Sequence, residues 1–256
     1  MEKTMFDFWK AQNDVIDQIL NTSFSAYVKT IPHFEKAFEF TLCNIGCIDE
    51  RVTGKGEVRI RIPGSGVLLS PEKMREIKEL VEKKCGIDIT GIMSHEGCGA
   101  CKVYAKKVGR ETDDLDVLAE EQVQLIAKEM DVPAHPQIPL SDMLKPENGH
   151  PARVCYYDAG SGFDPYFVPE LPKGFIVSRW CLNKEDAIAS LELAIHIALE
   201  GGGFKDLFTK DTPFLIVGIC DPKNSELNES VIRAELVPFV EKHEGRVKVE
   251  IFTKSL

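Results

Sequence analysis

Residues 38–51 read Phe-Glu-Phe-Thr-Leu-Cys-Asn-Ile-Gly-Cys-Ile-Asp-Glu-Arg, a near-continuous apolar run that ends at three charged side chains. Such a run is typical of a strand buried in a parallel sheet, so we predict a strand over residues 38–48. A second run, residues 87–93, leads in the same way into Ser94 and His95. The two segments that follow these strands are therefore the candidates for a functional site.

The rest of the chain alternates helical and strand patterns. Ser70-Pro71 is typical of a helix start and Gly86 of a helix end, while Asn183 opens a later helix. The predicted helices cover residues 71–85, 98–108, 113–130 (capped by Thr112 or Asp113), 184–200 and 225–243 (kinked at Pro238). Further strands are predicted over residues 57–62, 153–157, 214–220 and 247–252. This alternation predicts an α/β fold with a mostly parallel central sheet flanked by helices.

The same pattern predicts three segments. Residues 1–34 are amphipathic at roughly helical spacing and form an N-terminal helical arm, packed on the main body or on a neighbouring subunit. Residues 35–175 form the α/β core that carries both strand ends. Residues 176–256 are βαβ-like, and we expect them to extend the same sheet, because no linker rich in Gly, Ser or Pro precedes them.

The bulk composition argues against several classes of protein. The net charge is −10 and no basic stripe is visible, so nucleic-acid binding is not expected. The apolar runs are too short to span a bilayer, and the first residues carry acids in place of an apolar signal segment. We therefore expect a cytoplasmic protein with no membrane partner, whose eight cysteines are reduced thiols or metal ligands.

Two short motifs follow the predicted strands: CxDxR at residues 47–51 and HxxC at residues 95–98. Two thiolates and one imidazole, from Cys47, His95 and Cys98, suit a zinc ion that keeps its fourth position open, as catalytic zinc does. Residues two apart on a strand point the same way, so Asp49 and Arg51 can share the side of Cys47 and form a bidentate ion pair. The start of a helix at Cys98 favours its thiolate form.

CxDxR, followed by a Gly-containing loop and then by HxxCGA, resembles the beta class of carbonic anhydrases over roughly residues 35–110. The resemblance implies a zinc lyase that reversibly hydrates carbon dioxide to bicarbonate, with zinc-bound hydroxide as the nucleophile. By that resemblance Cys47, His95 and Cys98 are the zinc ligands, and Asp49 and Arg51 are the catalytic dyad. It also implies a homodimer or higher homo-oligomer.

The chain departs from that family in two places. Residues 61–66 read Arg-Ile-Pro-Gly-Ser-Gly, where the family loop reads Arg-Asn-Ala-Gly-Asn. Residues from about 175 onward have no counterpart in the family core. Relatives with this metal site also hydrolyse carbon disulfide or carbonyl sulfide, so the substrate does not follow from the ligands alone.

Other interpretations of the same residues stay open. Cys101 makes a CxxC motif with Cys98, which fits a closed Cys3His zinc site or a dithiol redox motif, both without the proposed catalysis. The cysteines and His95 could instead be unconnected core residues. Asp49 and Arg51 could form a purely structural ion pair.

Overall fold

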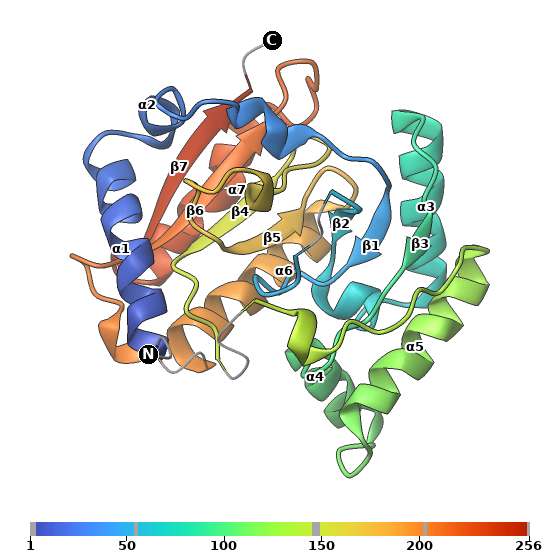
Figure 1. The fold of residues 1–256 in the computed structure, drawn as a ribbon. Coiled ribbons are helices and arrows are strands. Elements are labelled where there is room, and N and C mark those ends of the chain that lie inside the picture. The colour runs from blue at the N-terminus through green and yellow to red at the C-terminus, as the bar shows by residue number, and fades with distance from the viewer. Residues whose placement is uncertain (1–3, 54–55, 145–148, 202–203, 255–256) are drawn as a thin grey trace. The chain divides into compact units, whose positions relative to one another are not determined.

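The computed structural model describes residues 4–53, 56–144, 149–201 and 204–254. The chain divides into two compact units, Phe40–Glu147 and Met1–Glu39 together with Asn148–Leu256. Each unit contains one parallel sheet with helices beside it (Figure 1). The predicted α/β class with parallel strands and flanking helices is therefore confirmed. In place of one central sheet, the described residues form two.

The unit Phe40–Glu147 holds both sequence motifs. Its elements are β1 (Asn44–Gly46), β2 (Val58–Arg61), the 3₁₀ turn η2 (Pro63–Gly66), α3 (Pro71–Cys85), β3 (Gly91–Ile92), α4 (Gly99–Val108), α5 (Leu115–Met130) and the 3₁₀ turn η3 (Leu140–Asp142). The strand order is β2-β1-β3, and both pairings are parallel. The chain runs from β1 to β2, on one side of β1, and then to β3, on its other side. The strand order therefore reverses between β1 and β3, and the carboxyl ends of these two strands meet there.

Local signals set the ends of the helices in this unit. The Ser70 side chain accepts the N–H of the third helical residue of α3, and Gly86 ends that helix in the left-handed conformation. The cap of α5 is Asp114, where the sequence pattern predicted Thr112 or Asp113. All three side chains have the right chemistry for a cap, so the pattern alone did not choose among adjacent residues.

β1 and β3 are shorter than the apolar runs that predicted them. Ladder pairing is limited to Asn44–Gly46 and Gly91–Ile92. Phe38, at the start of the first run, closes the 3₁₀ turn η1 (Phe34–Phe38) in the other unit, where its ring lies 5.3 Å from that of Phe163. An apolar run predicts that its residues are buried, but it does not predict which part of the chain packs against them.

The unit formed by Met1–Glu39 and Asn148–Leu256 holds the longer sheet. Its elements are α1 (Met5–Asn21), α2 (Phe24–Val28), η1 (Phe34–Phe38), β4 (Val154–Asp158), η4 (Pro165–Phe167), β5 (Phe175–Ser178), α6 (Lys184–His196), the π-turn η5 (Ile197–Gly201), η6 (Lys205–Leu207), β6 (Phe214–Cys220), α7 (Glu229–Lys242) and β7 (Val247–Thr253). No helix in the described part of the chain is both long enough and apolar enough to cross a membrane.

The sheet of this unit has the order β5-β4-β6-β7, all parallel, and helices cover both of its faces (Figure 1). Leu215, Val217 and Ile219 on β6 join a core with apolar residues of α1 and α2. Gly218 points the opposite way, because a Cβ there would lie 2.8 Å from Ile232 on α7. Successive residues of the fully buried strand β6 thus point to opposite faces of the sheet, and both faces are apolar.

These units differ from the three predicted segments. Residues 1–34, predicted as an arm, contribute Ile16, Ile19 and Phe24 to the core beside the second sheet. β4 and β5 pair with each other although the predicted boundary falls between residues 175 and 176. β5 itself was not predicted, because its four residues sit in a stretch rich in Pro and Gly. Strand pairing, which is non-local, therefore sets the division of the chain.

Candidate metal centre

Cys47, His95 and Cys98 converge at the reversal in strand order between β1 and β3. Their ligand atoms all lie within 4.8 Å of one another, and all three side chains are buried. Zinc bonds of about 2.0–2.3 Å place tetrahedral donor atoms about 3.3–3.8 Å apart, so a small contraction of the side chains would complete such a site. The residues predicted as metal ligands thus form a cluster that could hold a metal ion.

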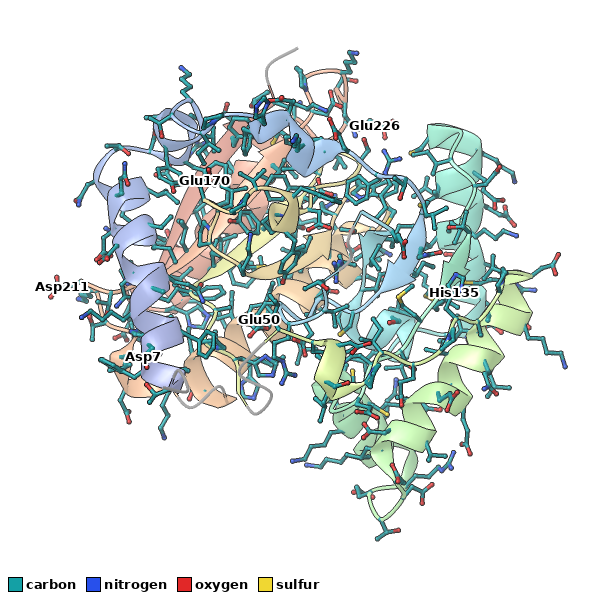
Figure 2. All side chains as sticks on the ribbon, in the orientation of Figure 1. Asp7, Glu50, His135, Glu170, Asp211 and Glu226 are labelled. Carbon is teal, nitrogen blue, oxygen red and sulfur yellow. The ribbon has the colours of Figure 1, made fainter. Side chains whose placement is uncertain are left out.

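Backbone pairing on both sides of His95 fixes its place. Residues 133–138 run alongside the end of β3, and His135, labelled in Figure 2, donates its N–H to the Ile92 carbonyl at 2.8 Å. Further along, the Ile138 N–H donates to the Ser94 carbonyl and the Glu96 N–H donates to the Ile138 carbonyl, each at 3.0 Å. These bonds keep the chain extended beyond the short β3 and hold His95 at the sheet edge.

The His95 ring has one satisfied and one open nitrogen. Its Nδ1 lies 2.9 Å from the Glu96 carbonyl oxygen, so we assign Nδ1 as the protonated nitrogen that donates there. Its Nε2 is fully buried and has no hydrogen-bond partner among the described residues. A buried nitrogen is rarely left without a partner, and a carbonyl bond at the other nitrogen is the usual arrangement of a metal-binding histidine. This nitrogen therefore fits a metal ion.

The charges in the cluster are strongly coupled. A hydrogen bond with Cys98, together with burial, raises the pKa of the Cys47 thiol well above its ordinary value. Burial acts to lower the pKa of His95, but the neighbouring Cys47 and Asp49 outweigh it and raise that pKa to about 9. In the bare protein both Cys47 and His95 therefore hold their protons more tightly than usual.

Asp49 and Arg51 form the predicted ion pair. Arg51 donates from Nε to Asp49 Oδ1 at 3.0 Å and from Nη2 to Oδ2 at 2.7 Å, and its backbone N–H also reaches Oδ1 at 2.9 Å. Both side chains are buried. Asp49 Oδ2 lies 3.9 Å from Nε2 of His95. The Arg51 guanidinium thus holds Asp49 Oδ2 beside Nε2 of His95 in the candidate metal centre.

Cys101, the second cysteine of the CxxC motif, is held elsewhere. Its Sγ donates to the Leu115 carbonyl at the start of α5, at 3.3 Å, and the residue is fully buried. Burial raises the pKa of its thiol to about 11. Among the described residues, the ligand cluster around Cys47 does not include Cys101. Its position therefore favours a packing role over a fourth ligand.

The sequence did not identify the contacts that η2 makes with Cys47. The Gly64 N–H lies 3.2 Å from Cys47 Sγ, and Ser65 Oγ donates to the Met93 carbonyl at 2.5 Å. Arg61, fully buried, donates to the carbonyl oxygens of Cys47 and Val52. The only signal for this arrangement was a Gly-Ser-Gly segment near the predicted site.

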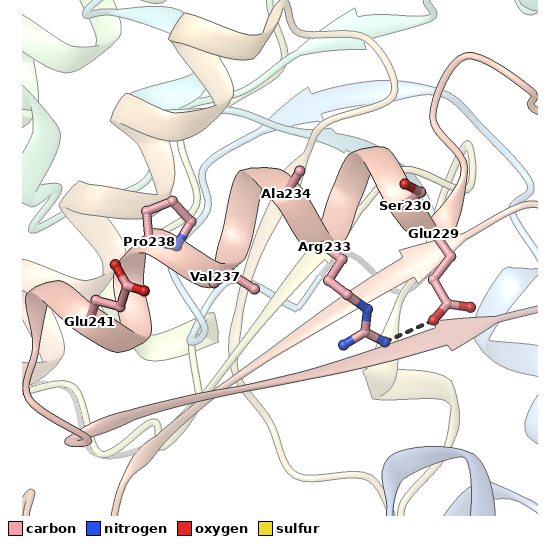
Figure 3. Close-up of a pocket in the computed structure, with 7 residues that line it drawn as sticks. All are labelled: Glu229, Ser230, Arg233, Ala234, Val237, Pro238 and Glu241. Carbon is pink, nitrogen blue, oxygen red and sulfur yellow. Dashed lines mark hydrogen bonds and ion pairs between the residues drawn. The ribbon is translucent and has the colours of Figure 1, made fainter.

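A separate hollow lies along the exposed side of α7 (Figure 3). Its lining comes from that helix alone and consists of Glu229, Ser230, Arg233, Ala234, Val237, Pro238 and Glu241. Glu229 and Arg233 pair with each other at 2.8 Å, one helical turn apart. Since this lining holds no Cys or His and its arginine is already paired, the metal centre is the stronger candidate site.

Comparison with known proteins adds no relative: no family model, no curated protein and no solved structure matches the chain.

Proposed function

We propose that this protein is a zinc-dependent lyase that reversibly hydrates carbon dioxide to bicarbonate. One observation supports the proposal above the others. Two buried thiols and the open nitrogen of a buried imidazole lie within 4.8 Å of one another, and a fixed carboxylate oxygen lies 3.9 Å from that nitrogen. Three protein ligands with a nearby acceptor are what a catalytic zinc site requires.

The ligands in this proposal are Cys47 Sγ, His95 Nε2 and Cys98 Sγ. These three residues would hold a zinc ion with one position left for water or substrate, and the ion would supply the Lewis acidity that makes a bound water more acidic. The N-terminus of α4 lies at Cys98, and a helix N-terminus is a favourable place for negative charge.

In this proposal Asp49 and Arg51 orient the attacking water molecule. Asp49 Oδ2 can accept a hydrogen bond from a water molecule beside the ligands, which would aim an oxygen lone pair at the carbon of carbon dioxide. Arg51 keeps both oxygens of Asp49 in one direction through its two-pronged contact. Because Arg51 donates to both oxygens of Asp49, this carboxyl group serves as a hydrogen-bond acceptor in the proposed site.

The proposal extends to the setting of the protein. A cytoplasmic location would keep the ligand thiols reduced, as metal binding requires. The sequence resemblance also implies a homodimer or higher homo-oligomer, which sedimentation equilibrium of the zinc-loaded protein would test.

The decisive experiment is stopped-flow hydration of carbon dioxide, with zinc content determined on the same samples. We expect turnover to rise in proportion to bound zinc, up to about one ion per chain. Zinc at that ratio without any hydration would contradict the carbon dioxide part of the proposal. Carbon disulfide and carbonyl sulfide hydrolysis would then be the next assays.

The variant Asp49→Ala tests whether zinc binding and turnover depend on different residues. The variant keeps all three ligands, so we expect full zinc content but a loss of turnover of about 10²-fold or more, the usual size for a positioned acid–base group. Unchanged turnover in Asp49→Ala would contradict the role given to Asp49.

A further inference from the structure

The turn η2, Pro63–Gly66, has a strained backbone beside the candidate metal centre. Gly64 has φ 56° and the next residue, Ser65, has φ 59°, so two successive residues are left-handed. A left-handed serine is uncommon, and such strain persists only where surrounding contacts impose it. Both residues are buried.

One of those contacts reaches a candidate ligand directly. The Gly64 N–H donates to Cys47 Sγ at 3.2 Å. A thiolate that accepts a backbone hydrogen bond has part of its charge neutralised and its direction fixed.

The other contact ties the turn to the strand that precedes His95. Ser65 Oγ donates to the Met93 carbonyl at 2.5 Å, two residues before His95, and the Ser65 N–H donates to the Ile62 carbonyl at 2.9 Å. The turn is therefore bonded both to the segment that carries Cys47 and to the segment that carries His95.

No space remains for a side chain at residue 64. A Cβ on Gly64 would lie 2.3 Å from Val67 Cγ1 and 3.0 Å from the Cβ of Ala100, in the first turn of α4. Relief of these contacts would move the turn away from the residues that follow Cys98. Gly66 differs, because the three atoms nearest to a Cβ there all belong to the flexible side chain of Met74, although its φ of 99° would still strain an alanine.

We propose that Gly64 and Ser65 are positioning residues for the metal ligands: Gly64 orients the Cys47 thiolate and Ser65 fixes the turn against the strand that leads to His95. This inference rests on the proposed metal site. Outer contacts of this kind typically change metal affinity by about 10–100-fold when they are removed.

The test is metal affinity, measured by competition with a chromophoric chelator for Zn²⁺, together with the absorption spectrum of the Co²⁺-substituted protein. We expect Gly64→Ala and Ser65→Ala each to weaken Zn²⁺ binding by about 10-fold or more. We also expect a shift of the thiolate-to-cobalt charge-transfer band in Gly64→Ala, because the sulfur loses its hydrogen bond.

Two further variants separate positioning from simple damage. Gly66→Ala strains the same turn without touching a ligand contact, so its metal affinity and cobalt spectrum should match the wild type. The double variant Gly64→Ala/Val67→Ala removes the 2.3 Å contact, and we expect it to recover part of the lost affinity. Val67→Ala alone serves as its control.

The outcomes distinguish this inference from the proposed function. Wild-type protein that binds no Zn²⁺ would overturn both. Wild-type protein that binds Zn²⁺, with Gly64→Ala and Ser65→Ala binding it equally well and with an unshifted cobalt spectrum, would overturn the positioning role alone. Equal losses of affinity in Gly66→Ala and Gly64→Ala would also overturn it, since general strain would then explain both.

Discussion

Cys98 and Cys101 lie within one helical turn at the start of α4, yet their sulfur atoms have different surroundings. Cys98 Sγ belongs to the ligand cluster, whereas Cys101 Sγ donates to the carbonyl of Leu115. Cys98 is the N-cap and so projects from the end of the helix, while Cys101 already lies on the buried side. At the scale of the residue, three positions along the chain thus separate a candidate metal ligand from a thiol in a packing position.

A matched pair of substitutions tests this assignment. We expect Cys98→Ser to lose zinc, because a neutral hydroxyl is a poor replacement for a thiolate. Cys101→Ser should keep about one zinc per chain, since a serine can still donate to the Leu115 carbonyl. Zinc per chain after gel filtration is the measurement. Loss of zinc in Cys101→Ser alone would instead support a site in which Cys101 is a ligand.

At the scale of the element, Arg153 attaches α1 to the start of β4. Its guanidinium is fully buried and donates to Asn13 Oδ1 at 2.7 Å and to the Pro213 carbonyl at 3.1 Å. It also lies 3.4 Å from Asp17 and 5.5 Å from the ring of Trp9. A charge buried this completely is tolerated because several acceptors and an aromatic face surround it.

Arg153→Met should therefore destabilise the protein. The methionine fills similar space but leaves a buried carbonyl and an amide oxygen without donors, so we expect a loss of about 2–4 kcal/mol in the free energy of unfolding. Urea denaturation followed by tryptophan fluorescence measures it. Asp17→Asn is the control: this side chain is half exposed, so a change below about 1 kcal/mol is expected.

Glu235 on α7 binds side chains from β4 and from the residue that follows β5. Arg179, just after β5, donates to both carboxylate oxygens at 2.9 Å, and the Tyr157 hydroxyl on β4 donates to Oε2 at 2.8 Å. Burial acts to raise the pKa of Glu235, but the hydrogen bonds from Arg179 and Tyr157 outweigh it and lower that pKa. The bonds favour the charged carboxylate.

This network predicts a loss of stability in acid. A carboxyl whose pKa is lower in the folded state contributes stability above its unfolded pKa of about 4.3, and that contribution disappears as the pH falls through the folded pKa. We therefore expect Glu235→Gln to be about 1–3 kcal/mol less stable than wild type at pH 7, with a smaller difference at pH 3. Urea unfolding across this pH range tests it.

The control for that experiment is Glu241→Gln, an exposed position on the same helix. We expect its stability to follow the wild type at every pH. A gap between Glu235→Gln and wild type that stays constant from pH 7 to pH 3 would contradict the proposed network.

At the scale of the whole molecule, the two sheets repeat one strand order. In each, the first strand in the chain lies between the second and the third: β2-β1-β3 in one unit and β5-β4-β6-β7 in the other. The candidate metal ligands, Cys47, His95 and Cys98, all belong to the unit Phe40–Glu147. Metal binding should therefore act on one unit more than on the other.

Hydrogen exchange with and without zinc tests this expectation. A ligand present at about 100 times its dissociation constant adds about 2.7 kcal/mol of stability to the structure that binds it. We expect zinc to slow exchange in β1, β3 and the start of α4, and EDTA to reverse the effect. Exchange in the longer sheet should change much less. Equal slowing in β4 and β6, or slowing that persists in Cys98→Ser, would contradict the assignment.

The sequence predicted much of the helical structure and the candidate ligands. Ser70 begins α3 and Gly86 ends it where predicted, because a cap is a contact between residues a few positions apart. Cys47 and His95 were predicted to meet because polar residues end both apolar runs. The extent of β1 and β3 was overestimated, since an apolar run is equally compatible with a strand or a buried turn.

The sequence by itself thus determined the α/β class, both ends of α3 and which side chains could bind a metal, because these depend on residue type and on neighbours along the chain. Only the tertiary structure decided that the strands form two sheets, that Cys101 lies apart from the ligands and that Gly64 faces the sulfur of Cys47. Each of these depends on contacts between residues far apart in sequence, and such contacts are fixed only when the whole chain packs.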